Sequence, residues 1–140
     1  MRCHQHPVSR AAALGLALSF LGPAWSAPEL LGSADLLKDP KFKGAYASAL
    51  GPRVKDRWLA SLSNSAPVRS IDVLGQRYQT ATPCKPHDCA DYNLMLLYGA
   101  SEGRVVGKLY EKGRISWIGT PDKAMQAELE MLWKKEFRQQ

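Results

Sequence analysis

The sequence is poor in cysteine and lacks a long apolar run, and both absences limit what the protein can be. Its 140 residues contain three cysteines, and no pair of C-x₂-C motifs occurs among them, which argues against a zinc-ligated domain. No stretch reaches the roughly twenty apolar residues that a membrane-spanning helix needs. Internal repeats and a second domain are also missing. The length and the composition therefore indicate one globular domain.

Clustered charge is a further absence. Lysine and arginine number 19 against 13 acidic residues, a formal net charge of +6. The basic residues are spread along the chain, and no nucleic-acid-binding motif accompanies them. We therefore interpret them as a solvated basic surface and expect no nucleic-acid partner.

The N-terminal segment is typical of a secretory signal. Arg2 and Arg10 supply the positive charge, Ala11 to Leu21 form an apolar run, and Gly22-Pro23 ends it. The run is shorter than a membrane-spanning helix. We expect an exported protein, located in the periplasm and free of the membrane once the signal is removed.

Cleavage after Ser26 fits the small-residue rule best, with cleavage after Ala27 as the alternative. The sequence then divides into a signal peptide, residues 1–26, and a single domain, residues 27–140. Removal of two arginines leaves a charge of about +4. It also removes Cys3, His4 and His6, to which we assign no role.

Helical periodicity appears at both ends of the domain. Ser33 is predicted to cap a turn over residues 34–38, and Asp39-Pro40 begins a helix that Gly51-Pro52 ends. A further turn is expected within residues 53–62. Thr120 is predicted to cap a final helix with Pro121 at its first position. Its apolar stripe comprises Met125, Leu129, Leu132, Trp133 and Phe137.

Between these helices the apolar period changes to two, which predicts β-strands. The connections are short, so neighbouring strands should be antiparallel. The expected fold class is α+β, a five-stranded antiparallel sheet with helices packed on it. The expected strands are residues 68–74, 77–82, 92–98, 104–111 and 114–118.

Cys84 and Cys89 enclose the segment that we consider functional, a loop projecting between two strands. An exported chain reaches an oxidising compartment, where a disulfide between these cysteines is expected. Three other chemistries compete with a structural disulfide. A structural zinc site needs four ligands, and this segment offers at most Cys84, His87 and Cys89. A thioredoxin-like redox centre has two residues between its cysteines, whereas four lie between these. A cysteine nucleophile needs a free thiol.

Pro86 and His87 give this ring its predicted character. Pro86 fixes its own backbone and restricts Lys85, so the loop should be rigid before it meets a partner. His87 could be a surface imidazole bonded to Asp88 or to the backbone. Its position at the tip of the ring favours contact with a partner.

The hexapeptide Cys84-Lys85-Pro86-His87-Asp88-Cys89 resembles the signature of the Ivy family, periplasmic inhibitors of vertebrate (C-type) lysozyme. Trp58, Ala66-Pro67-Val68, Gly75, Tyr78 and Trp117 agree with that resemblance.

The resemblance implies a protein without enzymatic activity, cofactor or metal. Its loop would enter the active-site cleft of C-type lysozyme, with His87 between the two catalytic carboxylates. Lys85 and Asp88 would make flanking polar contacts or hold the shape of the loop. It also implies a second target, the lytic transglycosylases of the cell itself, and a capacity to form homodimers. A periplasmic redox or metal protein is the alternative from a different class.

Overall fold

The computed structural model describes residues 31–139. The predicted signal peptide, residues 1–26, and both predicted cleavage sites lie outside the described residues. Among the described helices, none has the length and apolar character needed to cross a bilayer.

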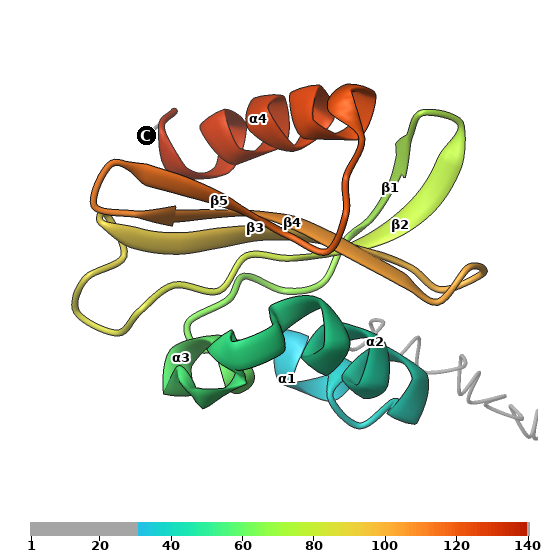
Figure 1. Cartoon of the computed structure of the whole chain (residues 1–140), viewed down its shortest axis with the longest axis horizontal. Helices are drawn as coiled ribbons and strands as arrows, with labels where there is room; N and C mark the ends of the chain where they lie inside the picture. Colours follow the sequence, from blue (N-terminus) through green and yellow to red (C-terminus); the bar gives the residue numbers. More distant parts are fainter. Residues whose placement is uncertain (1–30, 140) are drawn as a thin grey trace, which may run out of the picture.

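The centre of the structure is one sheet whose five strands lie in sequence order (Figure 1). Every neighbouring pair is antiparallel. The predicted α+β class and strand number are therefore confirmed. The strands are β1 (Ser70–Val73), β2 (Gln76–Ala81), β3 (Tyr92–Gly99), β4 (Arg104–Glu111) and β5 (Arg114–Ile118).

The central strand β3 is buried on both faces. Leu94, Leu96 and Tyr98 belong to one hydrophobic cluster, whereas Met95 and Leu97 belong to the other. A strand covered by helices on both sides reads as a continuous apolar run rather than an alternating one. The result is three layers, with the sheet between two sets of helices (Figure 1).

One face of the sheet is covered by the N-terminal helices α1 (Ser33–Leu36), α2 (Pro40–Leu50) and α3 (Arg57–Ala60) (Figure 1). The predicted extra turn within residues 53–62 is divided between α3 and a 3₁₀ helix, η1 (Gly51–Lys55).

The cap predicted for α1 is wrong. Gly32 is the N-cap, and Ser33 is the first helical residue. The Ser33 hydroxyl is drawn away because it donates to Ser65 Oγ at 2.6 Å.

The other face is covered by α4 (Lys123–Phe137) (Figure 1). Met125, Leu129 and Trp133 are its buried residues, in agreement with the predicted stripe. The predicted cap at Thr120 is wrong, because Asp122 is the N-cap and its Oδ1 accepts from the Met125 N–H at 2.8 Å. A carboxylate in this position satisfies a free backbone donor and complements the helix dipole.

Candidate functional site

The loop between β2 and β3 begins as a paired stem. Cys84 lies opposite Asn93 in an isolated antiparallel bridge. The Leu94 N–H donates to the Pro83 carbonyl and the Lys85 N–H donates to the Tyr92 carbonyl, both at 3.0 Å. The β2–β3 hairpin therefore extends beyond its regular strands and carries the loop at its end.

The tip of the loop is a tight turn from Lys85 to Asp88. The Asp88 N–H donates to the Lys85 carbonyl at 3.0 Å, and His87 has a φ of +66°. Proline at the second position and a positive φ at the third are the features of a type II turn. Histidine adopts this left-handed conformation more readily than most residues with a side chain. Pro86 and His87 together therefore determine the shape of the tip.

The His87 side chain lies exposed at this tip. Among residues 31–139, no hydrogen bond or ion pair to its imidazole is observed. Lys85 and Pro86 are also exposed, and Asp88 is half-buried. The three exposed side chains can therefore be reached by a partner.

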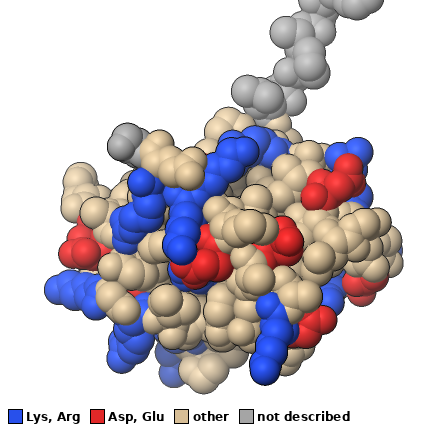
Figure 2. All heavy atoms as spheres, turned by 90° about the horizontal axis from the view of Figure 1, so that it is seen from above, with Lys and Arg blue, Asp and Glu red and all other residues tan. Residues whose placement is uncertain are grey.

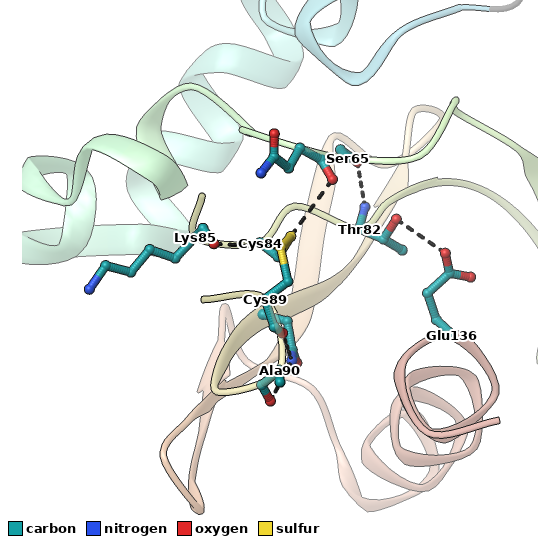
Figure 3. The surroundings of a disulfide bond; sticks show 9 residues. Ser65, Thr82, Cys84, Lys85, Cys89, Ala90 and Glu136 are labelled. Atoms are coloured by element: carbon teal, nitrogen blue, oxygen red, sulfur yellow. Dashed lines mark hydrogen bonds between the residues drawn. A yellow bond between two sulfur atoms is a disulfide. The ribbon is translucent and has the colours of Figure 1, made fainter. Parts of the chain in front are cut away.

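Cys84 and Cys89 form the predicted disulfide, with their Cα atoms 4.9 Å apart. Figure 3 shows the bond and its surroundings. Cys84 is buried, and its N–H donates to the Ser63 carbonyl at 2.9 Å. Two residues earlier, the Thr82 N–H donates to Ser65 Oγ at 2.8 Å (Figure 3). The incoming arm of the loop is thus fixed to the segment that follows α3.

The outgoing arm is held by Asn93, which the sequence analysis did not identify. Asn93 is fully buried, and its Nδ2 donates to the Cys89 carbonyl at 2.8 Å. Its Oδ1 accepts from Trp133 Nε1 of α4 at 2.6 Å. The available signal in the sequence was an amide within an otherwise apolar strand, four residues after Cys89.

The flank of the loop carries cations over an aromatic ring. Lys85 Nζ lies 4.3 Å from the centroid of the Tyr92 ring, and Lys112 Nζ lies 5.8 Å from it. The Lys112 N–H also donates to the Asp91 carbonyl at 2.8 Å. The β4–β5 turn is thereby joined to the base of the loop, and Lys85 is oriented along its side.

The disulfide bears on two of the three chemistries that compete with a structural role for this ring. With both sulfurs in one bond, neither cysteine presents the thiolate that zinc binding or nucleophilic attack requires. Within the part of the chain that the structure describes, no three His, Cys, Asp or Glu side chains are grouped to hold a metal ion. The arrangement is suited to presenting a loop.

Comparison with known proteins places this loop in a family. The family model described as "Inhibitor of vertebrate lysozyme (Ivy)" matches residues 41–140. The chain belongs to the Ivy family. The match begins at the second residue of α2 and includes the whole sheet, the loop and α4.

An Ivy-family relative is named "Inhibitor of vertebrate lysozyme" in Pseudomonas aeruginosa (strain PAO1). It is 31% identical to this chain over 99 residues, which cover 66% of this chain and 65% of the relative. The chain thus spans slightly less than two thirds of the relative's length.

Next to the Ivy-family loop lies a shallow, mostly apolar hollow of about 280 Å³. It is formed where the loop meets α3, and its lining residues are Arg57, Trp58, Ser61, Ser63, Lys85 and Pro86. A partner that surrounds the tip of the loop would therefore meet an apolar surface beside it.

The helices on this side are fixed to the sheet by an ion pair. The Arg53 guanidinium of η1 donates to both carboxylate oxygens of Glu111 at the end of β4, one of them at 2.9 Å. These hydrogen bonds raise the pKa of Arg53, with a smaller contribution from Asp56. Arg53 therefore stays charged, and η1 and the adjoining α3 have a fixed position beside the loop.

Proposed function

We propose that this protein inhibits C-type lysozyme by inserting the Cys84–Cys89 loop into the active-site cleft of the enzyme. The observation that carries the proposal is an exposed His87 at the tip of a disulfide-closed turn in an Ivy-family chain. The name of the Pseudomonas aeruginosa relative supports the same target.

The chemistry of the target explains the choice of a histidine. A glycosidase of this type uses two carboxyl groups, one as an acid and one as a nucleophile or stabiliser. An imidazole has two ring nitrogens, and in its protonated form both are donors. His87 would hydrogen-bond to both carboxyl groups at once, with charge-assisted bonds when it is protonated. No covalent step is needed, so the protein acts as a binder rather than as an enzyme.

The shape of the loop reduces the cost of binding. Each long side chain that must be ordered at an interface costs roughly 0.5–1.5 kcal/mol. In this loop the turn, the disulfide and the contacts of Cys84 and Asn93 order the backbone before any partner arrives. More of the contact energy is therefore retained as affinity.

In this proposal the protein is exported to the periplasm through the signal sequence in residues 1–26. There it would protect peptidoglycan from lysozyme that crosses the outer membrane. Inhibition needs only one molecule of protein per enzyme in a confined volume.

The proposal is tested by titrating the purified protein into a lysis assay with C-type lysozyme. We expect inhibition that saturates at a one-to-one ratio of inhibitor to enzyme. A lytic transglycosylase assayed in parallel distinguishes the two classes of glycan-cleaving target. Lysozyme activity that is unchanged at a large molar excess of the protein would refute the proposal.

A further inference from the structure

The two arms of the loop are held by different parts of the fold. The incoming arm is held by the hairpin stem and by the Ser63 carbonyl, which accepts from the Cys84 N–H. The carbonyls of Cys89 and Ala90 on the outgoing arm accept instead from side chains. Asn93 Nδ2 donates to Cys89 at 2.8 Å, and Arg138 Nη2 donates to Ala90 at 3.3 Å. In Figure 1 the loop and the C-terminal end of α4 lie on the same side of the molecule.

Asn93 is oriented by Trp133. The indole Nε1–H donates to Asn93 Oδ1 at 2.6 Å, so the amide oxygen faces α4 and the amide nitrogen faces the loop. Asn93 is fully buried and Trp133 is 6% exposed. A buried amide with both ends bonded has one favourable orientation, because the flipped amide would bring two donors and two acceptors together.

Trp133 is in turn fixed by charged neighbours. Lys108 Nζ lies 3.5 Å from the centroid of its ring, and the Arg138 guanidinium lies 4.6 Å from it. Lys108 is fully buried and bonded to Glu130 of α4. The indole therefore has little freedom, and the hydrogen bond to Asn93 is directional.

We propose that Trp133 and Asn93 are positioning residues that determine the direction of the outgoing arm of the loop, and with it the placement of His87. The disulfide fixes the distance between the two arms, and the Tyr92 N–H closes a turn by donating to the Asp88 carbonyl at 3.0 Å, but neither contact reaches the Cys89 carbonyl. The relay from Trp133 to Asn93 holds that carbonyl. Both side chains are too deeply buried to meet a partner, so their effect on inhibition acts through the loop. The part of this inference that concerns inhibition rests on the proposed function.

The decisive variant is Trp133→Phe, which retains an aromatic ring but lacks the indole N–H. Asn93→Asp is the second variant, because it keeps an acceptor for Trp133 and replaces the donor to Cys89 with an oxygen. Leu129→Val is the matched control, since Leu129 is a buried α4 residue in the same hydrophobic cluster as Trp133. Thermal unfolding confirms that each variant is folded.

Two measurements are made on each folded variant. The first is amide hydrogen exchange of Asp88, Asp91 and Tyr92, whose backbone N–H groups donate within the loop. This measurement needs no partner. The second is inhibition of C-type lysozyme. We expect exchange in Trp133→Phe to be about fivefold faster than in the parent, the effect of losing one hydrogen bond, with inhibition weakened about as much. Leu129→Val should leave both unchanged.

The two measurements separate the inference from the proposed function. Parental loop exchange in Trp133→Phe overturns the inference, whatever the lysozyme assay gives. Faster exchange with parental inhibition overturns the positioning role. Faster exchange in a protein whose parent inhibits no lysozyme supports the control of loop direction and refutes the proposed function alone. If Asn93→Asp fails to fold, Trp133→Phe decides the question.

Discussion

Cys84 lies opposite Asn93 in the same register that pairs Ala81 with Leu96. The loop is therefore the end of a long hairpin rather than an insertion between two separate strands. Its stem is held by backbone hydrogen bonds that do not involve the sulfur atoms. This relationship separates the stability of the fold from the rigidity of the tip.

Replacement of both cysteines, Cys84→Ala with Cys89→Ala, should leave the sheet folded and the tip less ordered. Closing a ring of about six residues is worth roughly 2 kcal/mol in the chain-entropy estimate, so the free energy of unfolding should fall by about that amount. Urea unfolding measures this loss, and inhibition of lysozyme should weaken in the same variant. The parent treated with a reductant is the control. Global unfolding of the variant in the absence of urea would contradict this account.

His87→Gly should strongly weaken inhibition without damaging the turn. Glycine is the preferred residue at the third position of a type II turn, and His87 has a φ of +66°. The thermal midpoint should therefore stay at or above that of the parent. Loss of a central contact residue typically costs 2 kcal/mol or more, so affinity for lysozyme should fall about thirtyfold or further.

His87→Asn is the matched control for shape, because asparagine also tolerates this conformation and retains a donor and an acceptor. It should retain more inhibition than His87→Gly. Equal inhibition by the parent and His87→Gly would show that the imidazole is not the group that blocks the enzyme.

The strands, the final helix and the disulfide could be predicted from the sequence because their signals are local. The alternation in β2 and the stripe from Met125 to Trp133 each depend on neighbours within a few residues. The pairing of Cys84 with Cys89 follows from their spacing and the expected compartment.

Other features could not be predicted, because they depend on contacts between distant residues. Ser33 is not a cap because its hydroxyl donates a hydrogen bond to Ser65, which lies far along the chain. Asn93 resembles an ordinary strand residue until Trp133 and Cys89 lie on either side of it. A lysine in a strand is ordinarily expected to face solvent, but Lys108 of β4 is fully buried, where its ammonium donates to Glu130 of α4.

The ion pair of Lys108 with Glu130 predicts an acid-sensitive contribution to stability. The bond to Lys108 is the main reason that the pKa of Glu130 is lowered. A carboxylate whose pKa is lower in the folded state than in the unfolded state stabilises the fold. For Glu130 this contribution is fully present above the unfolded pKa of about 4.5, and it is lost as the pH falls through the lower pKa of the folded state. The free energy of unfolding, followed by urea titration from pH 7 to pH 3, should decline over this range.

Two substitutions test that origin. Glu130→Gln leaves the ammonium of Lys108 buried without its counter-charge and should be strongly destabilising at pH 7. Lys108→Met removes the buried charge together with its need for a counter-charge, so it should lower the free energy of unfolding much less than Glu130→Gln does. Lys108→Met should also show a smaller decline at acid pH than the parent. Equal losses in the two variants at pH 7 would mean that the buried charge does not determine stability here.

The charge of the protein predicts how association depends on salt. Lysine and arginine exceed acidic residues by six in the full sequence and by about four once Arg2 and Arg10 are removed with the predicted signal peptide. On the face covered by α4, basic side chains lie among carboxylates (Figure 2). In the proposed complex with C-type lysozyme, which is itself basic, long-range forces would oppose the encounter, and the attraction would come from contacts within the cleft. Between about 50 and about 300 mM salt the Debye length falls from about 14 to about 6 Å. Added salt therefore screens the repulsion, and the association rate should stay constant or rise slightly over this range.

Lys123→Glu provides the matched variant, because Lys123 is exposed at the N-terminal end of α4, away from the loop (Figure 1). It lowers the net charge by two without altering the site. Association should be faster than for the parent at low salt, and the two rates should converge at high salt. Stopped-flow fluorescence measures both rates. A steep fall of the parent's association rate with salt would show that attraction between opposite charges, rather than contact within the cleft, brings the two proteins together.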